Sequence, residues 1–278
     1  MAKKIPNDQN GMLSGKEHGT NDTLTTPLHS SAPPPLEFFL GDANEMNDSS
    51  RGGNDVLIGV DGADQRMVAC GDAFMMEDSS RGGNDQIIGG TGGTGNQLLC
   101  GDACMMFDNA RGGNDLVIGG DGAINILIGD ACAMSDNARG GNDVLVAGNG
   151  GGINIMFGDA SGFGMDVAMS GNAVGGNDTL ISGNAVDNMW GDGETIIGTD
   201  VTTGADTFVF LQGNNADRIN DFRQTDHDQI DVSAYGFDDI GDLNISVVLG
   251  NTVIDFDNGN SVTLVGMTAP LTASDFIF

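Results

Sequence analysis

Aspartate recurs at two fixed places in this chain, and both places are glycine-rich turns. One series follows glycine in a Gly-Asp pair, and the other ends a Gly-Gly-Asn-Asp run. Carboxylate and backbone carbonyl oxygens are the ligands that Ca²⁺ prefers. The pattern therefore predicts several bound Ca²⁺ ions. The candidate ligands are Asp42, Asp72, Asp102, Asp130, Asp159 and Asp192 in the first series, Asp55, Asp85, Asp115, Asp143 and Asp178 in the second, and the outliers Asp22, Asp64 and Asp206.

A single turn offers too few oxygens to fill a calcium shell of six to eight ligands. Two turns stacked on successive coils could enclose one ion between them, so that binding and coil assembly become one event. The alternative is that Asp and Asn favour these turns only because they hydrogen-bond their own backbone. The regular alignment of the stations favours calcium, and Mg²⁺ is disfavoured because it demands strict octahedral geometry.

The turns belong to a repeated unit of about 30 residues, which predicts a stack of coils. Gly-Asp-Ala begins at Gly41, Gly71, Gly101, Gly129 and Gly158, and Arg-Gly-Gly-Asn-Asp begins at Arg51, Arg81, Arg111 and Arg139. Each unit carries three short apolar runs bounded by glycine, such as Val56-Leu57-Ile58, and these are typical of strands. We predict an all-β fold, a right-handed parallel β-roll or β-helix solenoid with a C-terminal β cap.

Three segments are predicted along the chain. Residues 1–36 hold a degenerate first coil around Gly19–Leu24 and a proline-rich loop. Residues 37–200 form the repeat solenoid. Residues 201–278 form a β domain that closes the open end of the stack.

The charge balance points to cations as the counterpart of this chain. It has 40 acidic and 10 basic residues and a net charge of -30. This excludes nucleic acid and anionic lipid as default partners. No stretch approaches the roughly 18 uninterrupted apolar residues that a membrane span needs, and residues 1–10 lack the apolar core of a Sec signal peptide.

Other residue types also recur at one offset per repeat. Met46, Met76, Met106 and Met134 are interpreted as core filler, with a hydrophobic binding strip as the alternative. Asp48, Asp78, Asp108 and Asp136, three residues before the arginines, suggest an ion-pair ladder; further cation ligands, or arginines that bind an acidic polymer, are the alternatives. Asn96, Asn125 and Asn154 stand where a second aspartate is expected, so half of each coil may lack an ion.

The four cysteines are predicted to stack as two pairs on neighbouring coils. Cys70 and Cys100 precede Gly-Asp-Ala, and Cys104 and Cys132 follow it. Strands in register lie about 4.8 Å apart, but parallel side chains are poorly angled for a disulfide. Buried free thiols are favoured over disulfides, and a thiolate metal site is less favoured still for want of a Cys-x-x-Cys pair.

These motifs resemble the RTX (hemolysin-type) family of calcium-binding secreted proteins, whose signature is Gly-Gly-x-Gly-x-Asp-x-apolar-x. The match here is Gly112–Gly122 and its sister copies. Residues 204–278 also look like the C-terminal domain of serralysin-type proteins, from Gly-Ala-Asp-Thr-Phe-Val-Phe to the final Asp-Phe-Ile-Phe. The resemblance implies calcium-dependent folding outside the cell and export through a type I ABC transporter with an uncleaved C-terminal signal.

The chain departs from that family in its unit of about 30 residues instead of 18, in its shortened glycine pattern and in its cysteines. The extra residues could form a loop or a third wall. The chain also has no His-Glu-x-x-His and no Gly-x-Ser-x-Gly, so we expect no enzyme. The expected role is structural or interactive; the alternative is a carbohydrate-binding or carbohydrate-active module, with a polysaccharide or the cell surface as partner.

Overall fold

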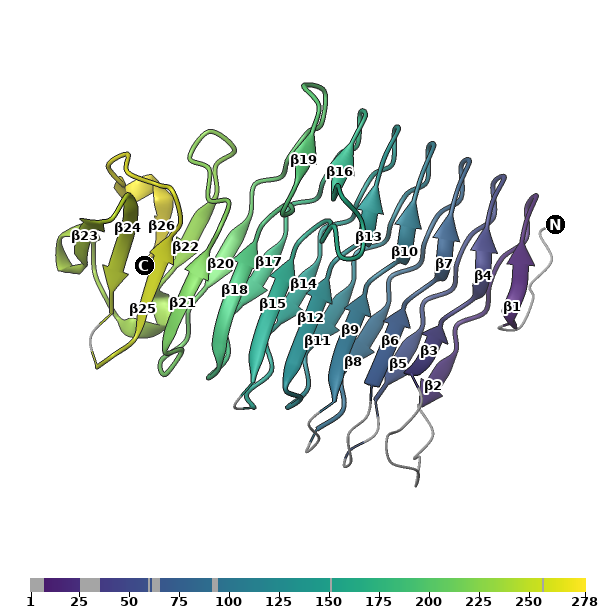
Figure 1. Cartoon of the computed structure of the whole chain (residues 1–278), viewed down its shortest axis with the longest axis horizontal. Coiled ribbons are helices and arrows are strands. Elements are labelled where there is room, and N and C mark those ends of the chain that lie inside the picture. Colours follow the sequence, from purple (N-terminus) through teal and green to yellow (C-terminus); the bar gives the residue numbers. More distant parts are fainter. Residues whose placement is uncertain are drawn as a thin grey trace.

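The computed structural model describes residues 8–25, 36–59, 61, 66–91, 95–150, 152–256 and 258–278. It is a right-handed parallel β-solenoid of about six turns of roughly 30 residues, with almost no helix. Figure 1 shows the coils stacked side by side from the N-terminal end to the C-terminal end. The predicted fold class is confirmed. No helix among these residues is long and apolar enough to cross a membrane.

Each coil contributes one strand to each of three sheets, so the coil has three walls. The seven-stranded sheet contains β1 (Asp8–Leu13), β4 (Ala43–Met46), β7 (Ala73–Met76), β10 (Ala103–Met106), β13 (Ala131–Met134), β16 (Met169–Ser170) and β19 (Ile196–Ile197). The nine-stranded sheet contains β2 (Thr23–Thr25), β5 (Val56–Ile58), β8 (Gln86–Ile88), β11 (Leu116–Ile118), β14 (Val144–Val146), β17 (Thr179–Ile181), β20 (Thr207–Val209), β22 (Gln229–Asp231) and β26 (Phe276–Ile277).

The ten-stranded sheet combines coil strands with the C-terminal cap. Its parallel part contains β3 (Leu36–Leu40), β6 (Arg66–Cys70), β9 (Asn96–Cys100), β12 (Ile124–Ile128), β15 (Ile153–Phe157), β18 (Val186–Trp190), β21 (Ala216–Ile219) and β25 (Ser261–Leu264). The antiparallel strands β24 (Asn251–Asp255) and β23 (Asn244–Val248) then cover its end. Short 3-10 turns at Ser233–Tyr235, Ile240–Asp242 and Ala273–Asp275 complete the cap.

Register places equivalent residues of the repeat directly above one another. Ala73, Ala103 and Ala131 are paired in the seven-stranded sheet, and Ile87, Val117 and Leu145 in the nine-stranded sheet. The degenerate first coil follows the same rule, because Leu24 pairs with Leu57. The sheets also run past residue 200, since β20 and β22 extend the nine-stranded sheet. The proline-rich loop of residues 30–35 lies outside the described residues.

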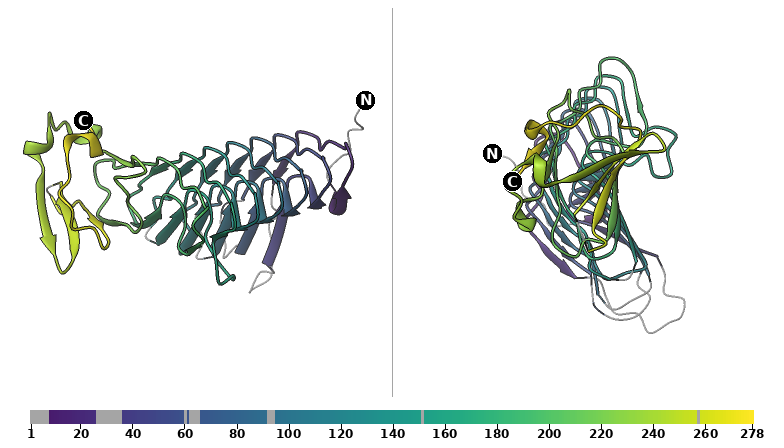
Figure 2. Two further views of the ribbon diagram at one scale, coloured as in Figure 1. Left: turned by 90° about the horizontal axis from the view of Figure 1, so that it is seen from above. Right: turned by 90° about the vertical axis from the view of Figure 1, so that its left-hand side faces the viewer.

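The apolar interior is divided into two parts. One lies between the nine-stranded and ten-stranded sheets and includes Leu57, Leu99, Leu127 and Phe208. The other lies under the seven-stranded sheet and contains alanines, Leu13, Met169 and the column Met46, Met76, Met106 and Met134, whose members are each at most 1% exposed. The interpretation of the methionines as core filler is confirmed. Figure 2 shows the elongated cross-section that contains both parts.

Candidate cation site between the carboxylate rows

Two rows of aspartate run along the interior of the solenoid. The corner row follows glycine at the two-residue turn between the ten-stranded and seven-stranded sheets, and consists of Asp42, Asp72, Asp102, Asp130, Asp159 and Asp192. The strand row precedes the nine-stranded sheet and consists of Asp55, Asp85, Asp115, Asp143, Asp178 and Asp206. Every member of both rows is at most 4% exposed. Of the predicted outliers, Asp206 thus joins the strand row, half-buried Asp22 continues it at the N-terminal end, and Asp64 lies outside the described residues.

The strand row forms a ladder between coils. The backbone N–H of Asp85 donates to Oδ1 of Asp115 at 2.7 Å, and the N–H of Asp115 donates to Oδ1 of Asp143 at 2.7 Å. The same bond repeats from Asp22 at one end to Asp228 at the other. One oxygen of each carboxylate is therefore committed to holding the next coil in register.

The corner row ties each coil to itself. Oδ1 of Asp102 accepts the backbone N–H of Gly113 at 2.7 Å, and Oδ1 of Asp130 accepts that of Gly141 at 2.6 Å. The donating glycine lies two residues before the strand-row aspartate of the same coil. The two rows therefore meet across the interior, where burial and, after it, the charge of Asp102 raise the pKa of Asp115.

The second oxygen of these carboxylates has no hydrogen-bond donor. The buried oxygens without a partner are Oδ1 of Asp42 and the Oδ2 atoms of Asp55, Asp72, Asp85, Asp102, Asp115, Asp130, Asp143, Asp159, Asp178 and Asp206. A buried polar atom without a partner costs about 1–3 kcal/mol, and an unpaired charge costs more. A whole column of such oxygens requires either protons or cations.

The unpartnered oxygens face other acceptors across the coil interface. Oδ2 of Asp115 and the carbonyl oxygen of Gly129 both lie less than 3.0 Å from the point where a Cβ on Gly101 would stand. The same convergence occurs at Gly71 and Gly158. Neither a carboxylate nor a carbonyl supplies a hydrogen, so two such oxygens repel unless a positive centre lies between them. These corners require glycine because any side chain would fill that space.

Successive carboxylates of the corner row also approach one another. Oδ2 of Asp72 and Oδ1 of Asp102 both lie less than 3.0 Å from the position of a Cβ on Gly82. Two carboxylates this close cannot both be ionised without a counter-charge. A divalent cation or a shared proton satisfies both.

Burial gives these groups a strong preference for the neutral form when no metal is present. Desolvation is the largest cause; it raises the pKa of Asp55 to about 8 and that of Asp102 to about 6. Desolvation and the charge of neighbouring carboxylates raise the pKa of Asp115 and Asp130 well above the usual range. At neutral pH the metal-free interior would therefore hold protons that a cation could displace.

A row of amides at another corner of the coil supplies donors to the neighbouring carbonyls, although Oδ1 of Asn125 and Oε1 of Gln97 are themselves without a partner. The Nδ2 of Asn125 donates to the carbonyl of Gly120 at 2.7 Å and to Oδ1 of Asn154 at 2.8 Å. The Nε2 of Gln97 makes the equivalent bond to Gly90 at 2.8 Å. An amide brings its own donor to the carbonyl, whereas an ionised carboxylate does not. Asn125 and Asn154 thus occupy one column as expected, but Asn96 was the wrong residue for it, because Asn125 pairs with Gln97 and Asn96 is exposed.

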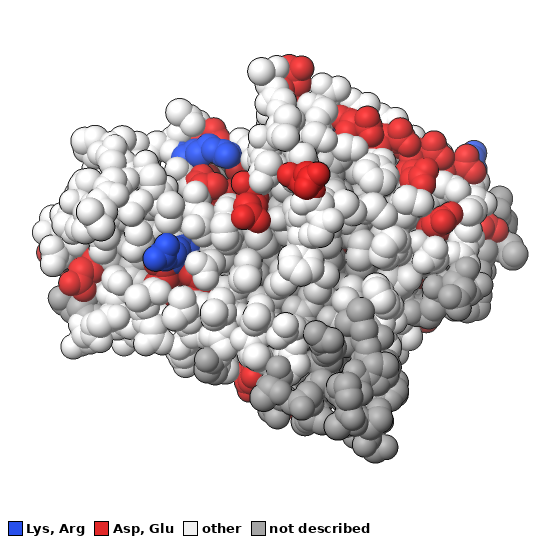
Figure 3. Space-filling view, viewed as in Figure 1, with Lys and Arg blue, Asp and Glu red and all other residues white. Residues whose placement is uncertain are grey.

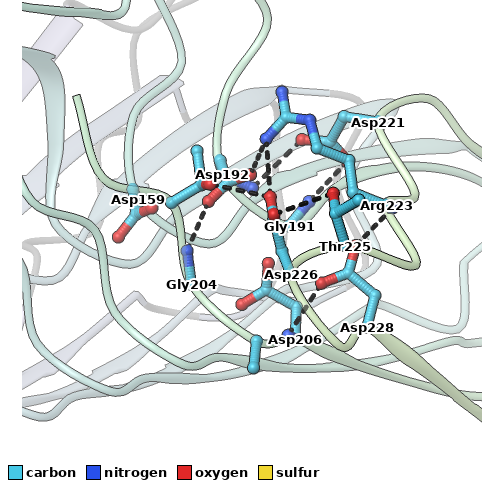
Figure 4. A network of polar contacts seen from close by, with 12 residues as sticks. Asp159, Gly191, Asp192, Gly204, Asp206, Asp221, Arg223, Thr225, Asp226 and Asp228 are labelled. Atoms are coloured by element: carbon cyan, nitrogen blue, oxygen red, sulfur yellow. Dashed lines mark hydrogen bonds and ion pairs between the residues drawn. The ribbon is translucent and has the colours of Figure 1, made fainter. Parts of the chain in front are cut away.

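The C-terminal end of the corner row has a cation from the chain itself. Figure 4 shows Arg223 reaching toward Asp192, near Asp221 and Asp226. Its Nη1 lies 2.5 Å from Oδ2 of Asp192, while Oδ1 of Asp192 accepts the N–H of Gly204 at 2.8 Å. Asp192 is consequently the corner-row member with both oxygens occupied. At the C-terminal end of the corner row, the guanidinium of Arg223 thus provides the positive charge beside the buried carboxylate of Asp192.

Several buried carboxylates were missed by the sequence pattern. Asp228 ends the strand row, and Asp221 accepts the N–H groups of Gly191 at 2.8 Å and Asp192 at 3.1 Å. Asp187 and Asp217 extend the amide row, because the N–H of Asp187 donates to Oδ1 of Asp217 at 2.9 Å. Alignment of Asp228-Gln-Ile with Asp206-Thr-Phe could have identified Asp228. Asp221, Asp187 and Asp217 lie in repeats that have lost the regular pattern, so no alignment identifies them.

The predicted ion-pair ladder between the outer arginine and aspartate columns is wrong. In the part of the chain that the structure describes, no carboxylate forms an ion pair with Arg51, Arg81, Arg111 or Arg139. Asp48, Asp78 and Asp108 instead take a left-handed backbone, with φ of 56–57°, and Oδ2 of Asp78 accepts the N–H of Asp48 at 3.0 Å. The aspartates are occupied by backbone bonds between coils, and the arginines are left as an unpaired positive column.

The position of the carboxylates explains why the surface is less acidic than the composition. Figure 3 shows one face that is largely uncharged, with acidic atoms gathered along one edge. Within the described residues no group of three or more His, Cys, Asp or Glu side chains forms a preformed metal cage. A cation at these corners would therefore be shared between carboxylate oxygens and backbone carbonyls. Comparison with protein-family models and with curated proteins found no match to this chain.

Proposed function

We propose that this chain is a secreted calcium-binding repeat protein whose solenoid folds when Ca²⁺ binds in the interior between successive corners. The observation that carries the proposal is the column of buried carboxylate oxygens that have no donor and face carbonyl oxygens of the next coil. Calcium accepts this mixture of charged and neutral oxygens, in flexible geometry. Asp115, Asp102 and the carbonyl of Gly129 represent the ligand types that each corner would supply.

The amide row and Arg223 support this interpretation. Where the corner carries Asn125 or Asn154, the donors are built in, and where the row ends, Arg223 supplies the charge. Among the described residues of the two rows, the carboxylates between these positions each have one buried oxygen without a partner. The proposed role is structural or interactive and not enzymatic, because every coil carries the same groups and no coil is singled out as an active site.

Export through a type I ABC transporter is part of the proposal and rests on the resemblance of residues 204–278 to serralysin-type C-terminal domains. A chain that stays loose in the calcium-poor cytosol and folds in millimolar calcium outside would suit such a route. Extracellular modules bind calcium with dissociation constants of about 10⁻⁴–10⁻³ M.

Calcium titration of the chelated protein tests the proposal. We expect far-UV circular dichroism at neutral pH to show little strand signal in excess chelator and a cooperative gain as Ca²⁺ is added, with Mg²⁺ much less effective. Asp85→Ala and Asp115→Ala together should shift the transition to higher calcium. A strand signal that is complete in chelator and does not respond to calcium would overturn the proposal.

The unpaired arginine column favours a second candidate, a module that binds an acidic polysaccharide. A groove of about 480 Å³ is lined by His18, Arg51, Arg81 and Arg111 together with Asn54 and Asn84. Arginines repeated at the coil spacing of about 4.8 Å would face the regularly spaced carboxylates of such a polymer. The rest of this strongly acidic chain would repel it.

Binding of polygalacturonate to the calcium-loaded protein tests this candidate. We expect affinity that falls with salt, no binding of neutral dextran, and a loss of about tenfold or more in Arg81→Gln/Arg111→Gln. The single variant Arg81→Gln is compared with Arg218→Gln, which removes the same charge from an exposed arginine of the ten-stranded sheet. Equal binding by Arg81→Gln and Arg218→Gln would eliminate the groove as the site.

A further inference from the structure

The four cysteines lie together at the Gly-Asp corner, where strands of the ten-stranded and seven-stranded sheets meet. They belong to a buried cluster with Leu40, Ile128 and Phe157. Cys70 and Cys100 are completely buried, and Cys104 and Cys132 are 8% and 5% exposed. All four are free thiols.

The four thiols form one cluster, which contains two diagonal Sγ–Sγ contacts. Sγ of Cys70 lies 3.2 Å from Sγ of Cys104, and Sγ of Cys100 lies 3.9 Å from Sγ of Cys132. Each pair joins the last residue of a strand in the ten-stranded sheet to the second residue of a seven-stranded-sheet strand one coil later. The turn at Gly-Asp brings these two walls together, so the side chains face each other across the corner. In-register neighbours such as Cys70 and Cys100 also lie close together, but parallel side chains are poorly angled for a disulfide.

The distribution of the cysteines fits two complete pairs. One coil earlier, the equivalent diagonal is Leu40 and Phe74, which is apolar. Cysteine replaces both members of that diagonal in the next two coils, and none is left over. Apolar filling alone gives no reason for thiols to come in facing pairs.

We propose that Cys70–Cys104 and Cys100–Cys132 form two disulfides when the chain meets a small-molecule disulfide oxidant. The thiolate of Cys104 attacks the oxidant, forming a mixed disulfide and releasing one thiol. The thiolate of Cys70 then attacks Sγ of Cys104 and displaces the second thiol, so two protein thiols are oxidised and one oxidant disulfide is reduced. Cys132, the more exposed member of the other pair, and Cys100 react in the same way.

The two bonds would join three successive coils independently of calcium. They close loops whose ends are 34 and 32 residues apart. Such cross-links stabilise chiefly by restricting the unfolded chain. Oxidation would therefore make this part of the solenoid resist unfolding when calcium is removed, whereas a reduced chain would stay loose in a reducing compartment.

Peptide mapping of the full-length protein provides the test. The reduced, calcium-loaded protein is exposed to oxidised glutathione, remaining thiols are alkylated, and the chain is cut before aspartate. Cleavage at Asp72, Asp102 and Asp130 places the four cysteines on four different fragments. We expect no alkylation, the linked pairs Cys70–Cys104 and Cys100–Cys132, and a higher urea midpoint in chelator than for the reduced protein.

A variant separates pairing from loss of folding. Cys70→Ser should retain the Cys100–Cys132 link and expose Cys104 to alkylation or glutathionylation. Four alkylated thiols after oxidation, links between Cys70 and Cys100, or a thiolate-to-Cd²⁺ absorption band that reports all four sulfurs on one metal would each overturn the proposal.

Discussion

Without calcium, the solenoid is expected to persist at about pH 5 and to unfold as the pH rises toward about 8. The carboxyls of the two rows have a raised pKa in the folded state, to about 6 for Asp42 and about 8 for Asp55, because burial disfavours their charged form. A group whose pKa is raised on folding stabilises the fold fully below its unfolded pKa, and that stability is lost as the pH rises through the folded pKa. The metal-free protein should therefore be stable in acid and unstable in mild base.

The expected size of this effect is large. Each carboxyl that is protonated only in the folded state changes the free energy of unfolding by about 1.4 kcal/mol per pH unit. Three such groups over two pH units give roughly 8 kcal/mol, which is comparable to the whole stability of an ordinary domain.

Urea unfolding in chelator across this pH range, repeated with calcium, measures the effect. Calcium should remove most of the loss at high pH, because the ion replaces the protons between the same oxygens. Stability of the chelated protein that stays constant or rises with pH would show that the carboxylates are not buried in the neutral form. That result would contradict the arrangement from which calcium binding is inferred.

Exchange of one carboxylate for an amide is expected to stabilise a single corner in the absence of calcium and to weaken its affinity for calcium. In Asp115→Asn the Oδ1 acceptor for the N–H of Asp85 remains, and Nδ2 becomes a donor for the carbonyl of Gly129, as Nδ2 of Asn125 is for Gly120. At about pH 8 in chelator this variant should be more stable than the parent by about 1–3 kcal/mol. Its calcium midpoint should rise about tenfold, because one charged ligand is lost.

Two matched variants make the comparison specific. Asn125→Asp should do the opposite, since it places a carboxylate against the carbonyl of Gly120 and Oδ1 of Asn154. Asp108→Asn, at an exposed position of the same coil as Asp115, changes the net charge equally and should have little effect. Chemical denaturation with and without calcium measures all three; if Asp115→Asn and Asp108→Asn behave alike, the effect comes from net charge and not from the corner.

The repeat itself made much of the architecture predictable. A repeated unit of about 30 residues with glycine-bounded apolar runs allows few folds other than a stack of strands, and equivalent residues then superpose by register alone. For that reason the strand stations, the methionine column and the two aspartate rows could all be identified before the coil cross-section was known.

The arrangement within one coil could not be obtained in the same way. Periodicity says which residues stack along the axis, but not which columns face each other across a turn. The arginine column was expected to pair with Asp108 and its equivalents. Because these aspartates lie in a left-handed turn, their carboxylates instead accept backbone N–H groups of the neighbouring coil. The cysteines stack in register on neighbouring coils as buried free thiols, as predicted, but their diagonal contacts across the Gly-Asp corner were not foreseen.

The sequence by itself determined the solenoid, the register between coils and the rows of candidate ligands, because one repeated local pattern is sufficient for each. Only the tertiary structure decided that there are three walls, that both carboxylate rows point inward toward each other, and that Gln97, Arg223 and Asp228 complete the rows. The physical reason is that these contacts join residues of different columns. Their geometry depends on the angle of every corner, which no single-column pattern specifies.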